Sequence, residues 1–235
     1  MRICQEYPRP AKLLENEQST LKFLTTDPDS WGDCTSLGSQ ARRALDRSRA
    51  GALYLSFEAH YDVRHEGSRM RLLFGALVSG RSAHAYEHVS YYLALCRSLN
   101  EARDDWELLR KFHFDHDPLT EAHPCLHLQY AGESPPSFGE LGLCDDHLYP
   151  WLSAPRVTCP PMSLALLLHF AFAEFRDENT VRFSERKCWR EIVCRDEALM
   201  LSWYYMKCGE HFQGSTGGSR LLFDRFYNGS QQADS

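Results

Sequence analysis

Residues 53–80 carry the clearest structural signal of the chain and read LYLSFEAHYDVRHEGSRMRLLFGALVSG. From Leu53 to Val63, apolar and polar residues alternate, which is typical of a strand with one buried face. A second alternating run, Met70 to Val78, follows the pair Glu66-Gly67. These residues therefore predict a β-hairpin with a two-residue turn at Glu66-Gly67.

A two-residue turn at this position also predicts the register of the hairpin. The facing apolar pairs are Val63 with Met70, Tyr61 with Leu72, Ala59 with Phe74, and Phe57 with Ala76. A slip of one residue would place apolar residues opposite polar ones, so the pattern specifies this pairing well. The same register puts Asp62 opposite Arg71, which is a favourable cross-strand charge pair.

A second hairpin is predicted from residues 112–118 and 123–130, with a loop of about five residues between them. The register that keeps the apolar sides together and closes the loop best gives three polar pairs: His113 with His127, Asp115 with Cys125, and Asp117 with His123. Directly opposed Cβ atoms lie ~4.5–5.5 Å apart, so these side chains could share one ligand.

The remaining segments are mostly predicted to be helical. Residues 82–99 fit a helix, but their run of β-branched and aromatic residues makes a strand the alternative. Residues 101–111 fit a short helix. Residues 131–161 are rich in proline and predict a long loop. Two apolar helices, 163–178 and 184–210, are expected to pack as a pair separated at Asn179-Thr180.

These elements predict an α+β fold, in which an antiparallel sheet of two or more hairpins is covered on one face by the C-terminal helices. Residues 1–50 are expected to form a helical and loop arm, and residues 51–212 a single domain. Residues 213–235 read as a flexible tail with a candidate docking peptide at 221–227.

Composition excludes several classes of protein. The 235 residues are 43% hydrophobic, which excludes wholesale disorder, and no apolar run reaches the ~18 residues of a membrane span. Acidic residues outnumber basic ones 32 to 26, which argues against sequence-independent nucleic-acid binding. Nine cysteines without C-x-x-C spacing, and no apolar leader, favour reduced thiols in the cytoplasm.

The sharpest candidate site is the polar face of the second hairpin. Two histidines and a carboxylate form a recurrent divalent-metal set, so His113, Asp115, His127 and His123 are the candidate metal ligands. The candidate catalytic residues are His113, His127, Asp115 and Asp117. A metal-free alternative uses the two imidazoles as an acid–base pair on a phosphodiester. The structural alternative is that the solvent face of a one-sided sheet is polar anyway.

Two further segments are candidates for binding. The basic residues Arg182, Arg186, Lys187 and Arg190 could contact nucleic acid or an acidic partner, but pairing with Glu185, Glu191 and Asp196 is favoured. The C-terminal peptide carries Phe223, Phe226 and Tyr227, which fold back on the domain or dock on another protein. His169, Trp189 and Trp203 are expected to be core residues.

The leading functional hypothesis is therefore an intracellular binding or accessory subunit of a multi-protein assembly, acting with a nucleic-acid-processing partner. It leads because no motif with an established mechanism is present. The expected partner is a protein or a second copy of the chain, rather than nucleic acid or a membrane. The alternative is a metal-dependent or His/His hydrolase of the phosphodiesterase or nuclease type, with a divalent metal as the candidate cofactor.

Overall fold

The computed structural model describes residues 7–26, 41, 43–44, 53–100, 105–116, 125–130 and 156–214. An N-terminal helix, α1 (Pro10–Thr26), precedes six strands: β1 (Tyr54–His65), β2 (Ser68–Ser82), β3 (Ala85–Asn100), β4 (Asp105–His116), β5 (Leu126–Tyr130) and β6 (Arg156–Thr158). Four helices follow: α4 (Leu164–Glu174), α5 (Glu178–Ser184), α6 (Lys187–Met200) and α7 (Ser202–Gly214). The predicted α+β class is confirmed.

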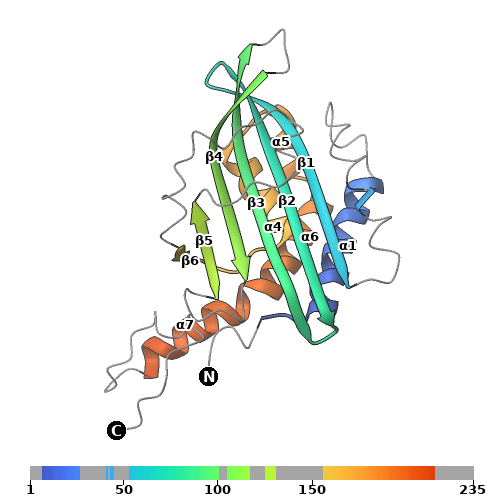
Figure 1. The fold of residues 1–235 in the computed structure, drawn as a ribbon, viewed down its shortest axis with the longest axis vertical. Coiled ribbons are helices and arrows are strands. Elements are labelled where there is room, and N and C mark those ends of the chain that lie inside the picture. The colour runs from blue at the N-terminus through green and yellow to red at the C-terminus, as the bar shows by residue number, and fades with distance from the viewer. Residues whose placement is uncertain are drawn as a thin grey trace.

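The six strands form one antiparallel sheet in chain order, as Figure 1 shows. The first hairpin has the predicted register, with Val63 opposite Met70 and Asp62 opposite Arg71. Its turn residues, Glu66 and Gly67, both have positive φ, at 49° and 80°. Positive φ at both central residues characterises a type I′ turn, whose twist matches that of the flanking strands.

The two helices predicted before the second hairpin are wrong, because both segments are strands. Residues 82–99 lie mostly in β3, and residues 101–111 lie largely in β4. Six consecutive residues of β3, from Val89 to Ala94, are buried. A central strand that is buried on both faces has no simple alternation, so its sequence resembles that of a buried helix.

The second hairpin is present, but its predicted register is wrong by two residues. Asp115 faces His127 rather than Cys125, and His113 faces Gln129 rather than His127. A shift of two residues leaves every side chain on the same face of the sheet. The long loop predicted at 131–161 is also interrupted, since β6 pairs with β5.

All four C-terminal helices differ in extent from the predicted pair. Thr180 lies inside α5, whose first turn is closed by reciprocal hydrogen bonds between Asp177 and Thr180, so the predicted break there is wrong. The single helix predicted at 184–210 is divided at Leu201 into α6 and α7. At the start of α4, the Ser163 hydroxyl accepts a hydrogen bond from the Leu166 amide.

The helices cover one face of the sheet, and α1 lies in the same layer (Figure 1). The main core lies between the layers and includes the large, nearly inaccessible side chains of Phe57, Phe74, Tyr91 and Trp189. Leu13, Leu21 and Leu24 place α1 in this core. Trp189 is a core residue as predicted, whereas Trp203 is only partly buried. Among the described helices, none has the length and apolar character needed to cross a membrane.

Candidate functional site

The face of the sheet turned away from the helices, called here the outer face, carries a polar row across all six strands. Its members are direct cross-strand neighbours, one on each strand in turn: Glu58, Gly75, Tyr92, His113, Gln129 and Arg156. The Tyr92 hydroxyl donates to Glu58 at 2.7 Å, and Arg156 Nε donates to Gln129 at 3.1 Å. Side chains therefore link β3 to β1 across β2, and β6 to β5, in addition to the backbone hydrogen bonds of the sheet.

Beside this row, the outer face brings together most of the predicted His/Asp residues. Lys111, His113 and Asp115 alternate along β4, and His127 lies opposite Asp115 on β5. His127 Nε2 is 3.6 Å from Asp115 Oδ2. These four residues form the outer-face cluster. The prediction that the imidazoles and the acid share the side away from the helices is confirmed for the described residues.

Within the outer-face cluster, His113 is a neutral imidazole at neutral pH. Burial, with the nearby charges of Lys111, His88 and His127, lowers the pKa of His113 from 6.5 to about 4. Its Nε2 atom is buried and has no hydrogen-bond partner in the described part of the chain. A neutral imidazole with an unused nitrogen can accept or donate a proton if a reactant reaches it.

Access to the outer-face cluster is restricted, however. Lys111 has no exposed surface and His127 is 2% exposed. In the described ranges, no three His, Cys, Asp or Glu side chains converge in a way that could hold a metal ion. Asp117 and His123 lie outside the described residues, so their part in a metal site stays a prediction.

The cysteines depart from the prediction of uniformly reduced thiols. Cys125 is fully buried and takes part in a disulfide. Free thiols are found at Cys96, Cys159, Cys188, Cys194 and Cys208. Cys125 therefore offers no thiolate to the neighbouring histidine.

The predicted basic segment is divided between two helices and is partly neutralised. Arg182 lies on α5 and pairs with Glu178 at 2.9 Å, while Lys187 begins α6 and lies 3.9 Å from Glu191. Pairing with Asp196 is wrong, because that side chain is fully buried elsewhere. Arg190 is exposed and Arg186 is half-buried. The peptide residues Phe223, Phe226 and Tyr227 lie outside the described residues.

Helix α7 exposes two large apolar side chains: Tyr205, which no sequence pattern singled out, and Met206, which belongs to the apolar repeat of residues 184–210 and was therefore expected to be buried. Tyr204 is buried in the core, and the ring of Trp203 packs edge-on against Tyr7. On the same helix, Tyr205 is 57% exposed and Met206 is 52% exposed. Figure 1 shows α7 extending past the end of the sheet.

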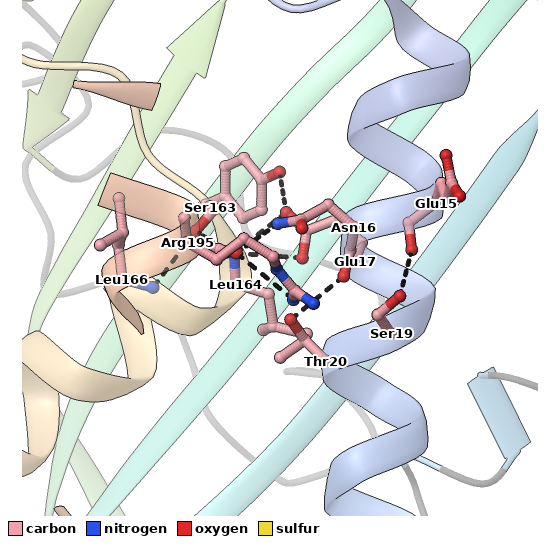
Figure 2. A network of polar contacts seen from close by, with 11 residues as sticks. Glu15, Asn16, Glu17, Ser19, Thr20, Ser163, Leu164, Leu166 and Arg195 are labelled. Atoms are coloured by element: carbon pink, nitrogen blue, oxygen red, sulfur yellow. Dashed lines mark hydrogen bonds and ion pairs between the residues drawn. The ribbon is translucent and has the colours of Figure 1, made fainter. Parts of the chain in front are cut away.

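A second constellation missed by sequence reasoning is a buried acidic network where α1 meets α4 and α6 (Figure 2). Glu17 and Asp196 have no exposed surface. Glu17 accepts hydrogen bonds from the Tyr91 hydroxyl at 2.6 Å and from the Leu164 amide at 3.1 Å. Asp196 accepts one from the Ser163 hydroxyl at 2.6 Å.

Two further side chains complete this network. The Asn16 amide donates to Asp196, and Arg195 Nη2 lies 3.6 Å from an Asp196 oxygen. Burial and the neighbouring Asp196 raise the pKa of Glu17 from 4.5 to about 8. The sequence did carry a signal, since each acid stands on the apolar stripe of its helix.

His169 is satisfied as predicted, because its Nδ1 accepts a hydrogen bond from Trp189 Nε1 at 3.3 Å. The structure thus offers three candidate sites: the outer-face cluster, the buried acidic network, and the exposed face of α7. Comparison of the chain with models of protein families, with curated proteins and with solved structures finds no match.

Proposed function

We propose that this protein is a binding or accessory subunit of a multi-protein assembly and that the exposed face of α7 docks on a basic partner protein. The observation behind it is the exposure of Tyr205 and Met206 on α7. Elsewhere in the described residues, large exposed hydrophobic side chains occur singly on β1, β3, β6 and α4, whereas α7 exposes two in succession. Tyrosine and methionine are enriched in the centres of protein interfaces.

The way α7 is held also favours docking. Tyr204 anchors one side of the helix in the core, so Tyr205 and Met206 are presented on a fixed element rather than on a free peptide. A rigid anchor loses little conformational entropy on binding. Beside the apolar pair, Glu210 is 50% exposed and forms an ion pair with Lys207 at 2.9 Å, so the polar surroundings of the pair are themselves ordered.

The charge of the chain indicates the chemistry of the partner. The formal net charge is −6, and basic proteins are attracted to an acidic one through long-range electrostatic steering. Proteins that process nucleic acids are commonly basic, because they neutralise phosphates with lysine and arginine. The expected partner is therefore a protein with an excess of Lys and Arg.

The test compares three forms of the full chain as bait in extracts of the cells that produce it. These are the wild type, the double variant Tyr205→Ser/Met206→Ser, and the control Phe170→Ser, which alters an exposed apolar residue of α4. We expect the wild type and the control to retain one basic protein. Binding by the double variant should be at least about thirtyfold weaker, since a central aromatic anchor contributes about 2 kcal/mol or more.

Three outcomes would contradict the proposal. The double variant could bind the same protein as well as the wild type does, the bound protein could be acidic, or nothing could bind specifically. Light scattering on the purified chain tests self-association. A dimer that the double variant abolishes would assign α7 to contacts between copies of this chain instead.

A hydrolase is the second candidate function, and the 3.6 Å approach of His127 Nε2 to Asp115 Oδ2 favours it. A carboxylate that orients one imidazole, with His113 on the same face, can support proton transfer to and from a phosphodiester. The burial of His127 weighs against it. The test is hydrolysis of bis(p-nitrophenyl) phosphate by the wild type, His113→Ala and His127→Ala. Activity that is lost in both variants, while both remain folded, would favour the hydrolase over docking alone.

The predicted cytoplasmic location stays a prediction. The disulfide at Cys125 weighs against it, because disulfides are rare in the reducing cytosol.

A further inference from the structure

The buried acidic network is the main polar connection between α1 and the helices α4 and α6. On α1, Asn16 reaches Asp196 of α6, and Glu17 reaches the first amide of α4 at Leu164. Figure 2 shows these side chains of α1 directed toward the start of α4 and toward Arg195. Apolar contacts add to this connection, since Phe23 of α1 packs against Phe183 and Trp189.

The charges in this network do not balance if both acids are ionised. The cation that faces the two carboxylates is Arg195, whose side chain is 46% exposed and lies on the Asp196 side. The other groups around Glu17 are hydroxyls and an amide, which carry no net charge. Two anions in a place without solvent are strongly unfavourable, so the pair holds one proton at neutral pH.

The charged and titratable groups near Glu17 come from several elements of the fold. The strand β3 presents the phenols of Tyr91 and Tyr86, and the segment before α1 presents Tyr7. Helix α6 presents Asp196 and Arg195, the start of α4 presents a hydroxyl and an amide, and the β2 side chains in the core are apolar. Burial, together with nearby groups, keeps the pKa values of all three phenols above their ordinary value.

The proton belongs on Glu17. Asp196 has three donors, Asn16, Ser163 and the positively charged Arg195, and hydrogen bonds to a carboxylate favour its ionised form. Glu17 has two uncharged donors. The pKa of Glu17, raised to about 8 by burial and by Asp196, agrees with this assignment.

We propose that Glu17 and Asp196 form a proton-dependent latch that holds α1 on α4 and α6, closed while the pair carries one proton and weakened when both acids ionise. The latch also reaches α7. Tyr7, just before α1, packs edge-on against Trp203 of α7 and stacks on His116 at 3.9 Å. Opening of α1 would remove Tyr7 from the first turn of α7.

The direction of the pH dependence follows from the two states of Glu17. In the open state Glu17 loses its proton near its ordinary pKa of 4.5, whereas in the closed state it keeps the proton up to a pH of about 8. Between these values opening releases a proton, so the opening equilibrium rises with pH by at most about tenfold per pH unit. Above this window the equilibrium no longer changes with pH.

Hydrogen–deuterium exchange of the full chain between pH 5.5 and 9, corrected for intrinsic exchange rates, tests the latch. In the wild type, the protection of the α1 amides should fall by up to about tenfold per pH unit and then level off near pH 8. The amides of β2 and β3 should not follow the same slope. Uniform protection of α1 across this range, or an equal slope in the sheet, would overturn the proposal.

Three variants separate the latch from a general effect of pH. Glu17→Gln supplies a neutral group of the same shape and should flatten the slope for α1. Asp196→Asn leaves Glu17 buried, and burial is the largest cause of its raised pKa, so this variant should keep a slope that levels off at a lower pH than in the wild type. Glu15→Gln changes an exposed acid on the same helix and should retain the wild-type slope. A wild-type slope in a folded Glu17→Gln variant would overturn the proposal, and the wild-type measurement decides the matter if that variant does not fold.

Discussion

Tyr92 occupies the space above Gly75, its direct neighbour on the adjacent strand. A Cβ atom built on Gly75 would stand 1.8 Å from Cε1 of the Tyr92 ring. From this position the Tyr92 hydroxyl donates to Glu58 at 2.7 Å. The missing side chain at Gly75 therefore lets one tyrosine span β2 and tie β3 to β1.

Gly75→Ala should destabilise the protein by about 1–3 kcal/mol, because the ring must move and its hydrogen bond is lost. Gly209→Ala is the matched control, since nothing lies within 4 Å of a Cβ at that helical position. This control should gain about 0.5–1 kcal/mol from helix propensity. Urea denaturation measures both changes, and equal effects of the two substitutions would refute the account of Tyr92.

The turn of the first hairpin gives a second prediction. Glu66 has a φ of 49°, which a residue with a Cβ adopts at a cost that asparagine largely avoids. Glu66→Asn should stabilise the protein by up to about 1 kcal/mol, whereas Gly67→Ala should destabilise it by about 1 kcal/mol. Thermal unfolding is sufficient to measure the two shifts. A decrease in stability for Glu66→Asn would be inconsistent with a type I′ turn.

The half-buried His113 predicts how stability responds to acid. Its pKa is lowered to about 4 in the folded protein, chiefly by burial, so the unfolded chain takes up a proton first as the pH falls. Stability is therefore lost between pH 6.5 and about 4. His113→Phe, which keeps a ring beside Tyr92, should lose less stability over this range. Unfolding free energies for both proteins across the range test this, and parallel pH profiles would contradict it.

The parts of the fold that the sequence predicted correctly are those set by local patterns. In the first hairpin, alternating apolar and polar residues flank a two-residue turn, and only one register satisfies both features. Val63 therefore pairs with Met70 as expected. In the second hairpin no turn motif specifies the loop length, and an even shift preserves the faces, so the register was wrong. The segment around Val89 is buried on both sides, a tertiary circumstance that periodicity does not reveal.

The candidate sites were predictable to a similarly limited extent. Asp115 and His127 were placed on one face correctly, because facing depends only on even or odd position. The burial of His127 was not predictable, since the polar face of a one-sided sheet is ordinarily exposed to solvent. Glu17 was noticeable as an acid in an apolar helical stripe, but its partner Asp196 is 179 positions away and is identified only by the packing of α1 on α6.

The central claim, that the exposed face of α7 docks on a basic protein, is tested most directly by hydrogen–deuterium exchange of the chain with and without its captured partner. The account predicts slower exchange in residues 202–214, where Tyr205 and Met206 lie, with little change at Phe170 on α4. Unchanged exchange in α7, with protection appearing instead on the outer face of the sheet around His113 and His127, would contradict it.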